Sequence, residues 1–425
     1  MVAAVKPRSA AIVVDLGFGD AGKGALVDRL TRDGADWIVR FNGGAQAGHN
    51  VVTRDGRHHT FAQFGAGTLA SASARTLLSR FVVVHPTALL VEARHLERVG
   101  VREPLLRVAI DERALVTTPY HQAAGRLREE LRGSARHGSC GVGVGETVAD
   151  SLSAPELTIV AGDLVDRARL ARKSSALRER KRAEMIALGA GSLAEFSVFD
   201  DEALAERWID AIAPAADRVV SRETAEAIVA GARRPVFEGA QGVLLDEDHG
   251  GHPHTTWSRC TFENASALLA ESRFEGPIER LGVVRAYAVR HGAGPLPTED
   301  AILEHDEPHN ATGPWQGAFR FGHFDRVLFD YALAACGGVD GVALTHVDQL
   351  GPRHGIALAY EGMEALRPGG RGDLEASAAR GRLLARARPI VEPLAGDPVK
   401  SLRAHVAAPV RFIASGPTAD DYRAT

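Results

Sequence analysis

The chain has 425 residues, of which 45% are apolar and 24% charged, and its formal net charge is −4. This length suits one large α/β domain or two domains with a sizeable core, and the negative charge argues against nucleic acid or an anionic membrane as a partner. Three scattered cysteines exclude a disulfide framework or a cysteine zinc site, so we expect a reducing, cytoplasmic compartment. Signal-peptide and membrane-spanning patterns are both missing from the sequence.

A glycine-rich turn follows the first predicted strand, an apolar run at residues 10–14, and leads into a helical pattern. The glycines of residues 17–24 allow the backbone to approach a phosphate, and the strand–turn–helix order directs N–H groups towards it. Lys23 adds a cation, and Asp20 adds a hard oxygen for Mg²⁺. Because Gly24 stands where a standard P-loop has a hydroxyl, this is not a Walker A motif, and a plain tight turn is the alternative.

A second glycine-rich loop, residues 42–50, follows another predicted strand at residues 37–41. It carries His49 on a backbone that can come close to a phosphate or a proton-transfer centre. An incidental histidine on a turn is the alternative interpretation.

Later segments supply further predicted elements. Strands are expected at residues 81–86, 108–110, 342–345 and 410–414, and a helix at 88–98. The basic stretch 167–182 predicts an amphipathic helix, and residues 202–232 predict one or two surface helices broken near Pro214.

The two loops and four later motifs, in the same order, resemble the adenylosuccinate synthetase family. The loops are Gly-Asp-x-Gly-Lys-Gly at 19–24 and Gly-Gly-x-x-Ala-Gly-His at 43–49. The later motifs are Phe-Glu-Gly-Ala-Gln-Gly at 237–242 with Asp-His-Gly at 248–250, Arg-His-Gly-Ala-Gly-Pro-Leu-Pro-Thr-Glu at 290–299, Thr-His-Val-Asp at 345–348 and Ser-Gly-Pro at 415–417. The resemblance covers nearly the whole chain.

The resemblance implies an α/β fold like that of P-loop NTPases, with a central, mostly parallel sheet flanked by helices. It implies a single domain over residues 1–425, with a helical excursion at about 164–232, and a homodimer. It also implies a Mg²⁺-dependent reaction in which GTP phosphorylates the 6-oxygen of a purine nucleotide such as IMP, after which an amino acid's amine displaces the phosphate. The expected partners are therefore small molecules.

The resemblance assigns roles in this chemistry to individual residues. Asp20 matches the base that deprotonates the purine N1, and His49 matches the donor that stabilises the transferring phosphoryl group. Lys23 is a cation for the phosphates, and Gln241 matches an amide that reads the purine N1/O6 edge. Mg²⁺ would be held by Asp20 and the Gly48 carbonyl. Phosphoryl transfer depends mainly on positioning and electrostatics, so loops and a metal suffice.

The resemblance also implies three groups of binding residues. For GTP they are Gly19, Gly22, Lys23, Gly24, Gly48, His49, Asn50, Thr345, His346, Asp348, Ser415, Gly416 and Pro417. For the acceptor they are Asp20, Ala21, Gln46, Ser139, Cys140, Gln241 and Thr256, and for the amine substrate they are Thr312, Gly313, Arg320 and His291. A carboxylate at position 348 can accept both N1–H and N2–H of guanine, which adenine lacks, so GTP is the expected phosphate donor.

The acceptor and amine side departs from the family's pattern. Val142 stands where the family has an arginine, and residues 152–156 lack the basic cluster whose arginine reaches the neighbouring subunit's nucleotide. Between residues 312–313 and Asp325, only Arg320 remains of the consecutive arginines that grip aspartate. Losing bidentate cations weakens the capture of phosphate and carboxylate groups.

We therefore expect a GTP- and Mg²⁺-dependent carbon–nitrogen ligase that is a paralogue with an altered substrate, in specialised metabolism. One alternative is an ordinary adenylosuccinate synthetase with compensating residues such as Arg259 and Arg320. Another is a non-catalytic nucleotide-binding homologue, which the retention of both Asp20 and His49 opposes. A branch of the family that acts on deoxyguanylate replaces the catalytic aspartate, so Asp20 argues against that branch.

Overall fold

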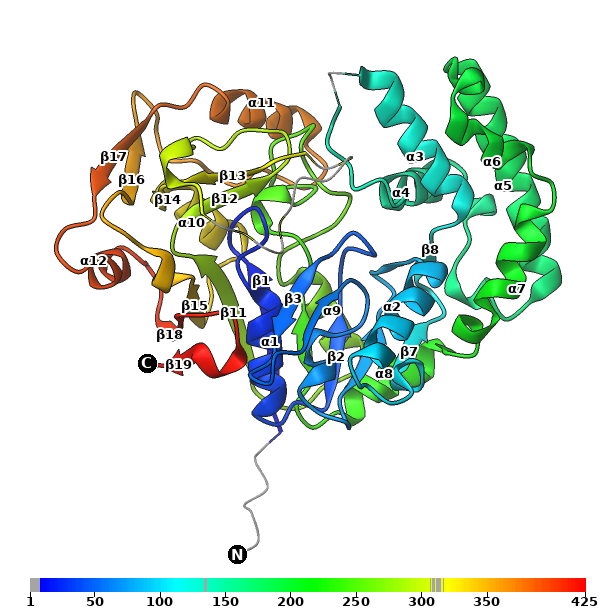
Figure 1. Ribbon diagram of the computed structural model, residues 1–425, viewed down its shortest axis with the longest axis horizontal. Helices are drawn as coiled ribbons and strands as arrows, with labels where there is room; N and C mark the ends of the chain where they lie inside the picture. The colour runs from blue at the N-terminus through cyan, green and yellow to red at the C-terminus, as the bar shows by residue number, and fades with distance from the viewer. Residues whose placement is uncertain (1–7, 134–135, 306, 308–309, 311–314, 316) are drawn as a thin grey trace, which may run out of the picture.

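The computed structural model describes residues 8–133, 136–305, 307, 310, 315 and 317–425 (Figure 1). Within these residues, ten strands form a central sheet in the order β19–β18–β15–β11–β1–β10–β2–β5–β7–β9, and every neighbouring pair is parallel except β18 with β19. The strands are β1 (Ala10–Asp15), β2 (Trp37–Arg40), β5 (Arg75–Leu78), β7 (Val108–Asp111), β9 (Val219–Val220), β10 (Val236–Glu238), β11 (Ile278–Arg285), β15 (Gly341–Thr345), β18 (Val410–Ala414) and β19 (Tyr422–Ala424). The sheet confirms the predicted α/β fold.

Helices cover both faces of this sheet, because successive residues of a buried strand point to opposite sides. In β1, Ile12 and Val14 pack into the core that includes α8, α9 and α10, whereas Val13 packs into the core that includes α1, α2 and α7. These helices are α1 (Lys23–Arg32), α2 (Pro86–Arg98), α7 (Leu204–Ala216), α8 (Arg222–Gly231), α9 (Glu263–Glu271) and α10 (Arg326–Ala335). The parallel strands therefore end at one edge, where the loops after β1, β10 and β15 emerge together.

A group of helices, α3 to α7, lies beside the sheet on the right of Figure 1. Besides α7 it contains α3 (Pro119–Arg132), α4 (Val144–Ser153), α5 (Arg167–Ala187) and α6 (Ser197–Asp200). Tyr120, Leu127, Met185 and Phe199 belong to a separate core between α3, α5 and α6. The single domain and the limits of its helical excursion stay predictions, as does the homodimer.

The remaining described strands form four small sheets. They pair β3 (His49–Val52) with β4 (His58–Phe61), β12 (Ala288–His291) with β13 (Phe319–Gly322), and β6 (Val83–Val84) with β8 (Leu115–Val116), and they join β14 (Phe324–Asp325), β16 (Gly355–Tyr360) and β17 (Pro389–Pro393). Helices α11 (Leu374–Leu384) and α12 (Pro398–Ala404) lie with the last of these sheets on the left of Figure 1.

The structure confirms two helices within residues 202–232 with a break near Pro214. Helix α7 continues through Pro214 to Ala216, and β9 separates it from α8. A proline this close to a helix end removes only one intrahelical hydrogen bond, and the buried side chains of Ile212 and Ala215 hold the last turn against the core. Trp208 is also buried, so α7 is not a purely superficial helix.

None of the described helices combines the length and the apolar character needed to cross a membrane.

Candidate active site

A cavity at the carboxyl edge of the central sheet brings together most of the residues predicted from the two glycine-rich loops. Its volume is about 1130 Å³, and it is open to solvent. The predicted residues that line it are Gly19, Asp20, Gly22, Lys23, Gly24, Gln46, Gly48, His49, Asn50, Gln241, His291, Thr345, His346, Gly416 and Pro417. Ligands of open α/β sheets collect at this edge, so the cavity is the candidate active site.

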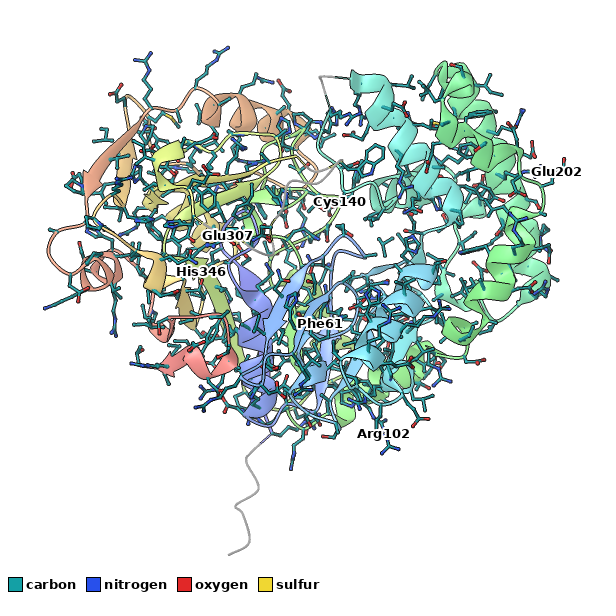
Figure 2. All side chains as sticks on the ribbon, viewed as in Figure 1. Phe61, Arg102, Cys140, Glu202, Glu307 and His346 are labelled. Atoms are coloured by element: carbon teal, nitrogen blue, oxygen red, sulfur yellow. The ribbon has the colours of Figure 1, made fainter. Side chains whose placement is uncertain are left out.

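The other predicted residues do not line this cavity in the described part of the chain. They are Ala21, Ser139, Cys140, Thr256, Arg320, Asp348 and Ser415, while Thr312 and Gly313 fall outside the described residues. Cys140 nevertheless senses the charge of Asp20. Burial and that charge raise the pKa of the Cys140 thiol to about 11. Figure 2 shows Cys140 towards the helical group, and His346 and Glu307, which also lines the cavity, towards the other side.

Asp15, the last residue of β1, organises the first glycine-rich loop. Its buried carboxylate accepts hydrogen bonds from the backbone N–H groups of Gly17 at 2.8 Å, Gly19 at 3.3 Å and Ala21 at 3.0 Å. The Lys23 ammonium lies 2.9 Å from the same carboxylate, and both side chains are buried. The first half of the loop is therefore folded around an internal anion, and its second half faces the cavity.

Asp20 stands on this loop in a left-handed backbone conformation, with φ at 59°. Burial raises the pKa of its carboxyl group, and the charge of Asp15 adds to this effect, while Lys23, His291 and Arg285 oppose it. Non-glycine residues rarely adopt this conformation, and they are enriched where a site requires it. A carboxylate with a raised pKa is a stronger base, which suits a group that accepts a proton near neutral pH.

His49 is held by a second buried carboxylate, Glu238 at the end of β10. Its Nδ1 lies 2.5 Å from Glu238 Oε1, and Glu238 Oε2 accepts the Ala66 N–H at 3.0 Å. Burial lowers the pKa of His49 to about 4. Burial alone would raise the pKa of Glu238, but the charges of Arg40 and His49 lower it. The pair is therefore a neutral imidazole oriented by an ionised carboxylate.

The two glycine-rich loops touch at Gly24, which explains why no hydroxyl stands there. A Cβ at this position would lie 2.9 Å from the Asn50 carbonyl oxygen and 3.0 Å from the His49 Cβ. Only glycine lets α1 begin this close to β3. A serine or threonine of the usual P-loop does not fit here, because His49 and Asn50 pack against Gly24.

Three buried polar atoms of the cavity wall have no hydrogen-bond partner within the described residues. They are Gln241 Oε1, Gln46 Oε1 and His291 Nε2. Gln241 is also in a left-handed conformation, with φ at 56°. Buried polar atoms without partners are costly, so their gathering in one cavity indicates a polar ligand that satisfies them.

The opposite wall is built from the end of β15 and the chain terminus. Thr345 Oγ1 donates to the Ala21 carbonyl at 2.8 Å, and the Tyr422 hydroxyl donates to the Gly22 carbonyl at 2.9 Å. His346 has φ at 57°, and burial lowers the pKa of its imidazole well below the ordinary value. Asp348 follows in a short, exposed 3₁₀ turn.

Cations on the acceptor side are engaged by other groups. Arg320 donates to the carbonyls of Gly292 at 2.8 Å and Gly294 at 2.6 Å and pairs with Glu299 at 2.6 Å. Arg259 pairs with Glu247 at 3.2 Å. The amine-binding role of Arg320 stays a prediction.

Sequence reasoning missed Asp15, Glu238 and Tyr422. Asp15 and Glu238 each end a buried strand immediately before a glycine-rich loop. This position is a usable sequence signal for a carboxylate that organises a site, since a buried charge needs a partner. Tyr422 gives no such signal, because its contact with Gly22 joins residues 400 positions apart.

The buried histidines predict a loss of stability in mild acid. Burial lowers the pKa of both His49 and His85 to about 4, below the ordinary 6.5, so the unfolded chain binds their protons more readily. Their stabilisation is complete above pH 6.5 and is lost as the pH falls towards 4, by up to about 2 kcal/mol per histidine at pH 5.

Urea unfolding at pH 7 and pH 5 measures this loss. His85→Asn, which can still accept the Ala88 N–H that His85 caps, should show a smaller loss than the wild type. An equal loss in both proteins would contradict this account.

Comparison with known proteins places this geometry in a family. The family model described as adenylosuccinate synthetase matches residues 12–420. The adenylosuccinate synthetase of Syntrophotalea carbinolica is 31% identical over 366 residues, covering 83% of this chain and 81% of that protein.

Solved structures agree in fold. The fully ligated adenylosuccinate synthetase from Plasmodium falciparum superposes with a TM-score of 0.78 at 20% identity, covering 99% of this chain and 100% of that one. The succinoaminodeoxyadenylate synthetase of cyanophage S-2L, bound to dGMP and dATP, superposes with a TM-score of 0.62 at 20% identity. The match covers 99% of this chain and 96% of that one. The chain belongs to the adenylosuccinate synthetase family of carbon–nitrogen ligases, which use GTP and Mg²⁺.

Proposed function

We propose that this protein is a GTP-dependent ligase that phosphorylates a carbonyl or amide oxygen of a purine-nucleotide-like acceptor and then replaces the phosphate with an amine, using substrates other than IMP and aspartate. The observation that carries the proposal is a contrast within one region. Asp20, Lys23, His49 and Gln241 line a single cavity, whereas Arg259 and Arg320 do not line it and pair with Glu247 and Glu299.

The activation step follows from the positions of these side chains. Asp20, with its raised pKa, accepts the acceptor's N–H proton, so that the neighbouring oxygen becomes nucleophilic. The Gln241 amide, whose Oε1 has no hydrogen-bond partner among the described residues, orients that acceptor edge. His49 and Lys23 face the same cavity and stabilise the charge of the transferring phosphoryl group.

The cavity also has donors suited to Mg²⁺. Asp20 and Gly48 both line it, and a carboxylate with a carbonyl oxygen is the hard oxygen set that Mg²⁺ prefers. Bound there, the ion would neutralise phosphate charge. Asp348, which lies beyond the end of β15, would recognise the guanine base of GTP.

The acceptor side supports a changed substrate because two aromatic rings and a carboxylate lie along its glycine-rich loop. Trp315 lies against Gly141, where a Cβ would come within 3.0 Å of the indole. Trp257 lies beside Gly145 and is 50% exposed. Glu129 accepts the Gly138 N–H at 3.1 Å, so a carboxylate already occupies part of that glycine-rich loop.

A matrix of acceptors and amines tests the proposal. With GTP and Mg²⁺, we expect little phosphate release from IMP and aspartate and robust, amine-dependent release with another purine-like acceptor, identified by mass spectrometry of the product. Full aspartate-dependent turnover of IMP would instead establish the ordinary enzyme. GTP binding without turnover on any acceptor would favour a regulatory homologue.

A further inference from the structure

We propose that Asp15 is the internal counter-ion of Lys23, and that nucleotide binding transfers the Lys23 ammonium from the Asp15 carboxylate to a phosphate oxygen. The inference rests on the proposed nucleotide site and adds to it a positioning residue. Asp15 does not line the cavity, so it acts through Lys23 and through the shape of the loop.

The first argument is that Asp15 holds Lys23 at a fixed place. The two groups are 2.9 Å apart, and their side chains are 3% and 0% exposed for Lys23 and Asp15. A buried ammonium without a partner would be very costly, so this contact sets the starting position of a side chain that also lines the cavity.

The second argument is that Asp15 already accepts hydrogen bonds from part of the loop's backbone. The N–H groups of Gly17, Gly19 and Ala21 converge on its carboxylate. An incoming anion therefore finds these three N–H groups already bonded and has to compete with Asp15 for Lys23. In Asp15→Asn the amide oxygen can still accept the N–H groups of Gly17 and Gly19, whereas the ammonium of Lys23 and the N–H of Ala21 lose their acceptor.

Asp15→Asn tests the inference through two readouts. We expect GTP to bind at least about tenfold more tightly in calorimetry, because Lys23 no longer has to give up a charged hydrogen bond to Asp15. The KM for GTP should fall as well.

Asp325→Asn is the matched control. Asp325 is a buried carboxylate that lines a neighbouring cavity together with Asp15, and it accepts the Tyr360 hydroxyl at 2.6 Å and caps α10. This variant should leave GTP affinity and the KM for GTP unchanged. Unchanged or weaker GTP binding by a folded Asp15→Asn protein would overturn the inference.

A structure of the wild-type protein with a non-hydrolysable GTP analogue tests the transfer of Lys23 from Asp15 to a phosphate without any variant. This structure should show Lys23 Nζ within hydrogen-bond distance of a phosphate oxygen. A bound analogue with Lys23 still on Asp15 and no phosphate contact would overturn the inference, whereas an analogue that does not bind at all would overturn the proposed function itself.

Discussion

Asp20→Asn should abolish turnover while GTP still binds. The amide cannot accept the acceptor's proton, and loss of a general base lowers kcat by about 10²- to 10⁴-fold. GTP affinity measured by calorimetry without Mg²⁺ should change little, because Lys23, His49 and the glycine-rich backbone remain. The acid limb of the wild-type kcat/KM profile should lie above the ordinary aspartate pKa of 3.8, since burial raises the pKa of Asp20.

Asp28→Asn controls for the loss of a buried carboxylate in the same segment. Asp28 is buried on α1 and pairs with Arg32 at 3.0 Å, outside the cavity lining. The Asp28→Asn variant should be less stable than the wild type, but its kcat should stay within a few-fold of the wild-type value. An active Asp20→Asn enzyme would remove Asp20 from the role of base.

Changes at His49 and Glu238 should give the second large effect. His49→Ala removes a group aimed at the transferring phosphoryl and should lower kcat by about 10²- to 10³-fold. The neutral imidazole donates Nδ1–H to Glu238, so its Nε2 donates to a phosphate only after it gains a proton. The charge of a triphosphate favours that protonation, and GTP binding at pH 7 should therefore take up a proton.

Calorimetry in buffers of different ionisation enthalpy measures this uptake. Glu238→Gln should diminish it and lower kcat, because the amide no longer stabilises the imidazolium. Glu92→Gln is the control, since Glu92 is also buried and also accepts loop N–H groups, from Ala62 at 2.9 Å and Gln63 at 2.8 Å. Equal proton uptake in wild type and Glu238→Gln would contradict the predicted protonation of His49.

The sequence predicted the fold and the meeting of its two glycine-rich loops at one edge of the sheet, because both depend on local patterns. Apolar runs ending in glycine-rich loops identify parallel strands and the edge at which Asp20, His49 and Gln241 meet. The ion pair of Lys23 with Asp15 and the bond of His49 to Glu238 depend on which strands become neighbours. That pairing is set by tertiary packing, which no short pattern reveals.

The acceptor side was less predictable for a related reason. The resemblance could say that arginines are missing, but not that Arg320 would bind the carbonyls of Gly292 and Gly294. A long side chain chooses among partners by distance, and those distances follow from loop geometry.

The contact between Tyr422 and Gly22 has a consequence for biosynthesis. The phosphate-facing turn leaves the ribosome long before the tyrosine that supports it. A nascent polypeptide therefore has an incompletely supported nucleotide pocket until Tyr422 has been synthesised, 400 residues after Gly22.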